Sequence, residues 1–554
     1  MKQNNLRRGA KPLLLLAAAS CSLLLLAACG NSSSQSGSQK KSIAVAIASE
    51  IETMDSNHSV DTTSGEVLNN TQEGLLLLGK KSKIEPGMAK SYKTSKDGKT
   101  YTYTLRKNAK WNDGTPVTAK DFVYAWRRIV TPKTAAENAY LFEPVKNGAA
   151  ISAGKMAPSK LGVKAEGKYK FVVTLEHPVS YFNLLVATAP FFPQEQKVVE
   201  KYGKKYGTTA SKTAYNGPFK LTDWNGSSNS WKLVPNKEYY NKSAVKLSSV
   251  KYQVVKEPST GLNMFENGQL DQTQLQGEQV QNMKNNKAFK EVEVASSNYI
   301  AINLKKASSA DTLKALQNQK IRQAFSVALN RKQFVKNVLA DGSLASNGLT
   351  AKGMQTEPGG STDFAKAAEV SSLTDYDAQK ATKLWKEGLK ETGLTGVTLT
   401  LTVDDTDTYK SIAEYLQSQW QKNLPGLKLS IRTVPKTTRV QYLMDGNFDL
   451  VLTGWNAEYN DPATYLNLED TGNTYNFGGY ENANYHKLMK TVNNSNNKKA
   501  RWKAMVAAQK QMTEDMPVVP LFQQTYSYLR NPKMQGLIEN LAGAEPGWRG
   551  VSLK

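Results

Sequence analysis

Cysteine and histidine are scarce in this 554-residue chain, which has two cysteines and three histidines. Cys21 lies inside an N-terminal apolar run that we expect to be removed, so Cys29 is the single thiol expected in the mature protein. A single thiol cannot form an intrachain disulfide or a cysteine-rich metal site, and three histidines leave little for a histidine-based metal site or a catalytic triad. We therefore expect no cofactor and no bound metal.

Several motifs of enzymes are also missing. The sequence has no GxxxxGK[ST] loop, no HExxH and no GxSxG, and no GxGxxG follows a predicted strand. Nucleotide hydrolysis on a P-loop, zinc-dependent proteolysis and serine esterase chemistry thus lack their usual residues. A peptidase of another kind is the weakest interpretation, and we expect a protein that is not an enzyme.

The N-terminus has the pattern of a lipoprotein signal peptide. Four basic residues precede the apolar run Leu13–Ala28, which at 16 residues is shorter than the roughly 20 that span a bilayer. The run ends in LAAC, which resembles a lipobox, so we expect residues 1–28 to be cleaved and Cys29 to carry a lipid. Residues 29–42, which follow, are rich in Gly, Ser and Gln, a composition typical of a flexible tether. An ordinary signal peptide with a chance cysteine is the alternative.

Positive charge exceeds negative charge in the chain as a whole. The formal net charge is +24, and removal of four basic residues with the signal peptide leaves about +20. Because these residues are scattered, without an arginine-rich helix or an aromatic-interleaved stripe, we expect no nucleic-acid partner. Lipid headgroups and wall polymers are the polyanions available outside a cell. A disulfide-free lipoprotein indicates the extracellular face of the membrane of a Gram-positive bacterium.

Residues 397–455 contain the clearest topology. Apolar runs at 397–403, 427–434 and 448–455 alternate with helical patterns at 408–424 and 437–446. This βαβαβ order predicts an α/β fold with parallel strands and right-handed crossovers. Ligands of such sheets bind beyond the carboxyl ends of the strands, where the stretch GWNAEYNDPATYLN follows.

Two acidic features near helix starts are better explained as caps than as active-site acids. Thr118 and Asp121 have the spacing of a capping box for a helix that begins at residue 119. The cluster DDTD, Asp404–Asp407, could be imagined as a cation site, but it lacks the glycine and distal glutamate of a calcium loop. A helix N-cap in a solvated turn is the favoured interpretation.

The stretch KNAKWNDGTPVTAKDFVYAWRRI, Lys107–Ile129, closely resembles the signature of the family 5 extracellular solute-binding proteins, in particular the oligopeptide-binding lipoproteins of ABC importers. Further segments resemble the family in the right order: QEGLL (72–76), LGVKAEGKYKFVVTLEHPVSYF (161–182), YNGPFKLTDW (215–224), IRQAFSVALNRKQFV (321–335) and FDLVLTGWNAEYNDPATYLN (448–467). The resemblance therefore covers nearly the whole mature chain.

This resemblance implies a bilobal, periplasmic-binding-protein-like α/β fold of class II, cluster C, with an additional third domain. Domain I would comprise residues 43–80, 212–305 and 525–554, domain II residues 81–211, and domain III residues 306–524. Oligopeptides would bind in an interlobe cleft and pass to a membrane permease with its cytoplasmic ATPases. The protein would act as a monomer attached to the membrane by its N-terminal lipid.

The resemblance also implies a peptide site at 454–458. Glu458 stands where the family has an acid that neutralises the α-ammonium of the peptide, a charge that would be costly to bury unpaired. Gly454 and Asn456 would bond the peptide main chain, and Trp455 would wall a side-chain pocket. A solvated loop glutamate and a core tryptophan are the alternatives for Glu458 and Trp455.

A facing segment, VDTTSG, would bond the other side of the peptide, chiefly through Thr62 and Thr63. Main-chain hydrogen bonds are common to all peptides, so they give affinity without side-chain choice. A narrower receptor for a signalling peptide and a surface adhesin that uses the basic charge are the remaining alternatives.

Overall fold

The computed structural model describes residues 41–543 and 546–554. The chain divides into residues 1–40 and residues 41–554, and only the second unit is described here. The expected signal peptide, the lipid-bearing Cys29 and most of the tether therefore lie outside the described residues. Within the described part of the chain, no helix is both long and apolar enough to cross a membrane.

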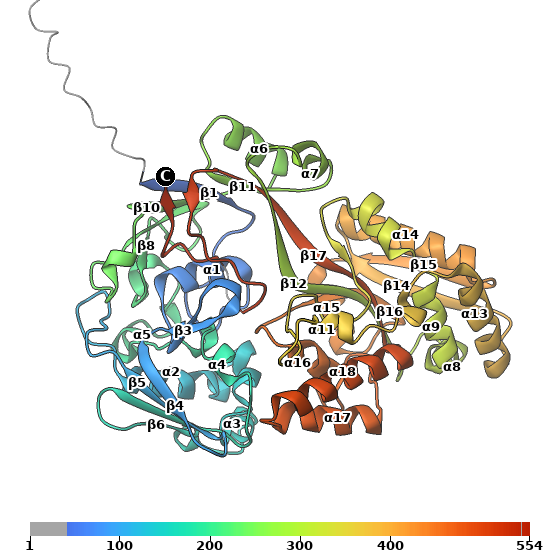
Figure 1. Cartoon of the computed structure of the whole chain (residues 1–554), viewed down its shortest axis with the longest axis horizontal. Helices are drawn as coiled ribbons and strands as arrows, with labels where there is room; N and C mark the ends of the chain where they lie inside the picture. The colour runs from blue at the N-terminus through green and yellow to red at the C-terminus, as the bar shows by residue number, and fades with distance from the viewer. Residues whose placement is uncertain (1–40, 544–545) are drawn as a thin grey trace, which may run out of the picture. The chain divides into compact units, whose positions relative to one another are not determined.

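A mixed sheet of eleven strands forms the centre of this unit (Figure 1). Its order is β15 (Leu427–Val434), β14 (Val397–Asp404), β16 (Leu450–Asn456), β12 (Phe289–Ile302), β17 (Val518–Arg530), β11 (Gln272–Leu275), β1 (Ser42–Ile47), β10 (Ser249–Val254), β9 (Ser230–Pro235) and β8 (Phe219–Thr222), with β13 (Leu344–Ala345) beside β17. Strands from distant parts of the sequence are thus joined in one hydrogen-bonded array.

The βαβαβ unit predicted from the sequence is confirmed. β14 pairs in parallel with both β15 and β16, and the helices α14 (Asp407–Asn423) and α15 (Lys436–Met444) connect them. α14 buries Ile412, Leu416 and Trp420, an apolar face at helical spacing. Its N-cap is Thr406, and Asp404 instead forms an ion pair of 2.6 Å with buried Arg439. The DDTD cluster therefore supplies a turn and an internal ion pair.

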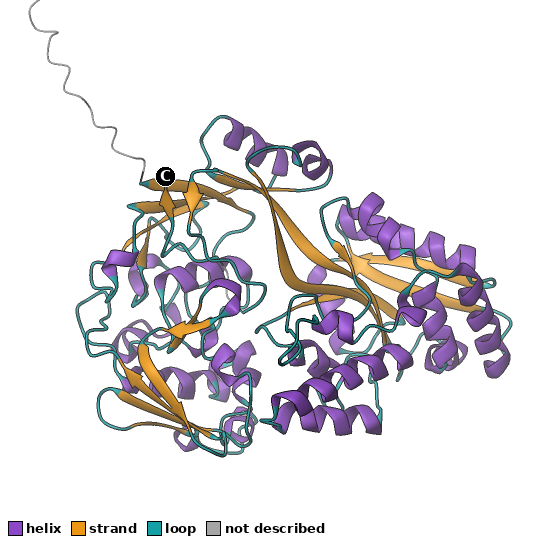
Figure 2. Ribbon diagram, in the orientation of Figure 1, coloured by secondary structure: helices purple, strands orange, loops and turns teal. Residues whose placement is uncertain are grey.

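Two long antiparallel strands, β12 and β17, run side by side in the middle of the sheet (Figure 2). Their register shifts between Glu293 and Ser297, where pairing is interrupted by an irregularity. β16 pairs with the carboxyl half of β12, while β11 pairs with the carboxyl half of β17. These two strands consequently link the parallel strands β15, β14 and β16 to the other side of the sheet, formed by β11, β1, β10, β9 and β8.

A separate antiparallel sheet lies within residues 89–174. It has the order β4 (Ala89–Thr94), β5 (Thr100–Leu105), β7 (Lys170–Thr174) and β6 (Val163–Ala165). The helix α2 (Ala119–Ile129) buries Phe122 and Trp126 against it, and the Trp126 ring meets Phe171 edge-on at 5.0 Å. The expected capping box of Thr118 and Asp121 is present at its start.

The remaining longer helices are α1 (Thr62–Thr71), α6 (Pro258–Glu266), α8 (Ala310–Gln317), α9 (Gln319–Val327), α13 (Ala378–Thr392), α17 (Ala483–Asn494) and α18 (Lys498–Asp515). The mixed α/β, multidomain character expected from the sequence is confirmed. The boundaries assigned to the three domains remain predictions.

Candidate functional site: an acid beside a free strand edge

Glu458 lies just beyond the carboxyl end of β16, in the loop that leads to the short helix α16 (Ala463–Leu466). Three side chains donate hydrogen bonds to its carboxylate. The Tyr140 hydroxyl donates to Oε1 at 2.8 Å, Trp455 Nε1 donates to Oε2 at 3.3 Å, and the Thr464 hydroxyl also donates to Oε2. The side chain is half-buried, so it is neither a fully solvated loop charge nor a core residue.

The carboxylate of Glu458 is surrounded by neutral donors. Burial raises its pKa above the ordinary value, and the hydrogen bonds from Thr464, Tyr140 and Trp455 oppose that rise. No lysine or arginine forms an ion pair with Glu458 in the part of the chain that the structure describes. Because an acid partly removed from water is costly to leave without a cation, the site would be stabilised by a positively charged ligand group.

Aromatic rings border the same carboxylate. The ring centroids of Trp455 and Tyr475 are 4.8 Å apart, and those of Tyr140 and Tyr475 are 5.7 Å apart. Ring faces attract cations, so this arrangement favours the same kind of ligand group as the acid. Trp455 is half-buried and donates to Glu458, which supports a role at the wall of the site.

The loop that carries Glu458 is anchored at its next turn. Asp461 forms a bidentate ion pair with Arg501 of α18, with both N–O distances 2.7 Å. The ring of Tyr459 stacks on that of Tyr181 with centroids 4.5 Å apart, and the Arg501 guanidinium lies 5.5 Å from the Tyr181 ring. These contacts fix the backbone on the carboxyl side of Glu458 and so restrict where its side chain can point.

On the amino side of Glu458, β16 is paired with β12 along one edge, while its other edge is paired only in part. Ala457 N donates to Ala295 O at 2.8 Å, and Asn303 N donates to Asp449 O at 3.0 Å. Main-chain groups alternate in direction along an antiparallel strand, so the odd-numbered residues from Asp449 to Ala457 turn their N–H and C=O groups toward β12. The even-numbered residues turn theirs to the opposite edge.

Gly454 and Asn456 are therefore directed away from β12. On that side β14 pairs with β16 only as far as Val451, so the edge beyond Val451 has no strand partner among the described residues. Both residues are exposed. A Cβ at Gly454 would lie 2.8 Å from Asn298 Oδ1, which explains the glycine. An extended peptide could add as a strand at this edge, next to Glu458.

Thr62 and Thr63 open helix α1 behind the N-cap Asp61, whose Oδ1 accepts from Ser64 N at 2.7 Å. Thr62 is exposed, whereas Thr63 is buried and its hydroxyl is 2.8 Å from that of Ser49. As the first residues of a helix they have main-chain N–H groups without intrahelical acceptors. No hydrogen bond among the described residues connects them to β16 or Glu458, and their role remains a prediction.

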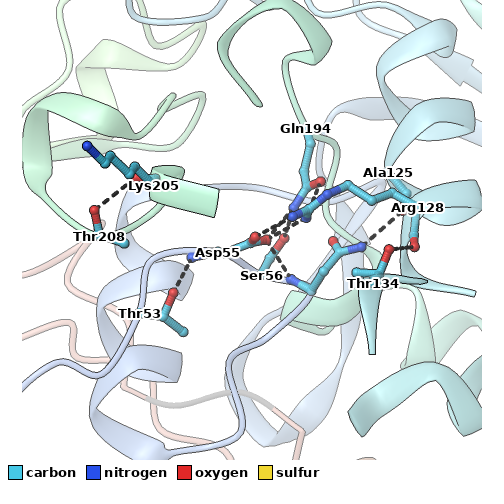
Figure 3. Close-up of polar contacts among 10 residues, drawn as sticks. Thr53, Asp55, Ser56, Ala125, Arg128, Thr134, Gln194, Lys205 and Thr208 are labelled. Atoms are coloured by element: carbon cyan, nitrogen blue, oxygen red, sulfur yellow. Dashed lines mark hydrogen bonds and ion pairs between the residues drawn. The ribbon is translucent and has the colours of Figure 1, made fainter. Parts of the chain in front are cut away.

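The loop before Thr62 is held by residues far away in sequence. Asp55 forms a bidentate ion pair with Arg128 of α2, in which Nη1 and Nη2 donate to the two carboxylate oxygens at 2.8 and 2.7 Å (Figure 3). Gln194 Nε2 also donates to Asp55 Oδ1 at 2.9 Å. Further along the loop, Asn138 Nδ2 donates to Ser59 O at 3.0 Å. This part-buried ion pair thus fixes the start of the segment that leads to Thr62.

One short helix bonds both to the loop before Thr62 and to Glu458. The 3-10 helix η3 (Glu137–Phe142) carries Asn138, which bonds the loop before Thr62, and Tyr140, which bonds Glu458. Neither residue was expected from the sequence, and nor was Thr464. No sequence motif links them to Glu458, and only the fold brings them together. Among the described residues, no group of three or more histidine, cysteine or acidic side chains could hold a metal ion.

Comparison with known proteins defines the class. The family model of the bacterial extracellular solute-binding proteins, family 5 (middle region), matches residues 83–477. A dipeptide-binding protein of Lactococcus lactis subsp. cremoris (strain MG1363) is 39% identical over 510 residues, covering 90% of this chain and 92% of the relative. The chain belongs to family 5 of the bacterial extracellular solute-binding proteins, a family of binding proteins and not of enzymes.

Solved structures agree. OppA of Listeria monocytogenes bound to peptide shares 36% identity and a TM-score of 0.79, over 93% of this chain and 99% of that one. The pheromone receptor PrgZ shares 34% identity and a TM-score of 0.80, over 93% of this chain and all of that one. Both likenesses extend across the same α/β architecture.

Proposed function

We propose that this protein captures oligopeptides at the edge of β16 and delivers them to an ABC importer. The observation that carries this proposal is the position of half-buried Glu458, which has no basic partner among the described residues, beside main-chain groups of Gly454 and Asn456 that have no strand partner there. The edge would bond the main chain of any peptide, and the acid would take its α-ammonium. The peptide bound to the similar Listeria OppA supports this substrate class.

Native mass spectrometry of the purified full-length chain tests the proposal directly. Peptides should co-purify with the protein and be released on unfolding. Isothermal titration calorimetry with peptides of two to nine residues would then define the length range. A protein that binds none of these peptides, or that carries a ligand without peptide bonds, would exclude oligopeptide capture.

We further propose that Cys29 is lipidated and holds the protein at the outer face of a Gram-positive cell membrane. Cys29 lies in the lipobox-like LAAC and is followed by a Gly/Ser-rich segment long enough to act as a tether. Cys29→Ala should release the protein into the medium. Membrane retention of the variant in cell fractions would contradict lipid anchoring.

A receptor for one signalling peptide is the second candidate, supported by the similarity to PrgZ, described as a pheromone receptor. The two roles predict different binding profiles. A transport receptor should bind many unrelated peptides with similar affinity, whereas a signalling receptor should prefer one sequence by at least a hundredfold over a scrambled version.

A further inference from the structure

The outer face of α2 lines a cavity of about 670 Å³. This cavity is remote in sequence from β16 and Glu458. Lys120, Val123, Tyr124 and Arg127 line it from successive turns of α2, while Lys164 and Ala165 of β6 line the opposite side. Residues spaced by three and four positions share one helical face. The cavity is therefore a groove between the outward stripe of α2 and the edge strand of the small sheet.

The lining is basic and contains no acidic residue. Two of its four basic side chains already form ion pairs. Arg128 pairs with Asp55 (Figure 3), and Lys164 Nζ lies 2.5 Å from Glu166 Oε1. Lys120 and Arg127 form no ion pair within the described residues. Two unmatched positive charges, seven residues apart on one helix face, remain available to a ligand.

Arg127 also has a donor without an acceptor. Its Nη2 donates to Ser159 O at 3.0 Å, but its buried Nε has no hydrogen-bond partner among the described residues. Buried N–H groups are nearly always satisfied. The hydroxyls of Thr131 and Thr134 donate to main-chain carbonyls of α2 at 2.6 Å, so their protons are not free for a ligand. The charged donors of the cavity thus call for an acceptor-rich anion.

We propose that this cavity binds a phosphate monoester. Such a group carries a charge of about −1.5 to −2 at neutral pH and three strong acceptor oxygens, which match the charges of Lys120 and Arg127, the two lining cations without an ion pair among the described residues. Val123, Ala165 and the Tyr124 ring would pack against the organic part of the ester. The ester comes either from a small soluble metabolite or from a lipid headgroup, since both present the same phosphate.

Calorimetric titration of the purified full-length chain with sn-glycerol 3-phosphate in 150 mM salt tests the soluble source. Binding to phosphatidic acid in phosphatidylcholine vesicles tests the lipid source. We expect saturable binding in at least one arm. Lys120→Gln and Arg127→Gln should each weaken it at least tenfold, without changing affinity for peptides.

Lys133→Gln is the matched control, because Lys133 is an exposed lysine close in sequence to α2 that does not line the cavity. It should change binding by less than twofold. Lys120 is exposed and its side chain forms no hydrogen bond or ion pair among the described residues. We therefore expect Lys120→Gln to fold normally, and it decides the result if Arg127→Gln lowers stability through the lost Ser159 contact. No saturable binding in either arm, or equal weakening by Lys133→Gln, overturns the proposal.

Discussion

Tyr140 and Glu458 are 318 residues apart in the chain, yet the Tyr140 hydroxyl donates to Glu458 Oε1 at 2.8 Å. With Trp455 and Thr464, it makes three donors on one carboxylate. No basic side chain among the described residues pairs with this carboxylate, so its charge is not neutralised by the protein. The acid is thus held in one orientation while retaining capacity for a cationic ligand.

The first prediction concerns the charge of Glu458. Glu458→Gln keeps the size and the acceptor oxygen but removes the charge, so affinity for a free peptide should fall by about 1.5–3 kcal/mol, the range for a hydrogen bond to a charged group. Calorimetry with one peptide and its N-acetylated form measures this. Acetylation should weaken binding to the wild type by a similar amount and have no further effect on the variant. Independent, additive losses would separate Glu458 from the peptide N-terminus.

The second prediction is a pH dependence of peptide affinity. Burial raises the pKa of Glu458 above the ordinary value, and the bound α-ammonium requires the ionised form. Affinity should therefore rise with pH as Glu458 loses its proton, with a midpoint above that of an ordinary glutamate. It should level off until the peptide amine deprotonates at about pH 8. Titrations between pH 4 and 7.5 measure the midpoint.

Two variants check that assignment. Glu458→Gln should flatten the pH profile, because no proton remains to titrate at that position. Tyr140→Phe removes a hydrogen bond that holds the pKa down, so its midpoint should move to higher pH. A midpoint that is unchanged in both variants would assign the titration to another group.

The local elements of this fold could be predicted from the sequence. The βαβαβ unit and the capping box of Thr118 and Asp121 follow from periodicity and from side-chain chemistry within a few residues. The position of Glu458 beyond the end of a parallel strand follows from the same pattern. These features depend on contacts close in the chain, which sequence patterns report directly.

The rest of the site depends on long-range pairing. β12 pairs antiparallel with both β16 and β17, and nothing in its sequence specifies those partners. That pairing decides which main-chain groups of β16 are free. Likewise, Tyr140 stands in a 3-10 helix without any motif, and its contact with Glu458 exists only in the folded chain. A single sequence carries no direct signal for such contacts.

The third prediction tests the free edge of β16. Asn456→Pro removes a main-chain N–H that faces away from β12, and edge strands tolerate proline when that N–H has no partner in the sheet. Peptide affinity should fall by about 0.5–1.5 kcal/mol, the net contribution of one hydrogen bond, with little loss of stability. Asn456→Ala keeps the N–H and should bind peptides nearly as well as the wild type. Equal losses in both variants would indicate a side-chain role instead.

The fourth prediction concerns stability and Glu469, a buried residue of the 3-10 helix η10 (Asn467–Glu469). Burial raises the pKa of Glu469 to about 8 from 4.5. Below about pH 4.5 it is protonated in both states, so it has no pH-dependent effect. Between the two pKa values the unfolded chain releases the proton that the folded chain retains, so stability falls as pH rises. The total over the interval between the two pKa values is about 5 kcal/mol, at 1.36 kcal/mol for each pKa unit.

Glu469→Gln removes this titration. The variant should therefore gain stability relative to the wild type as the pH rises from 5 to 8, which thermal unfolding at several pH values measures. Glu481→Gln is the control, because the Glu481 side chain is 65% exposed and its ion pair with Lys305 lies at the surface, where such pairs contribute little. The difference in stability between Glu481→Gln and the wild type should stay nearly constant with pH. If the difference in stability between Glu469→Gln and the wild type is equally constant from pH 5 to 8, then Glu469 is already ionised in the folded protein over this range, and burial does not raise its pKa.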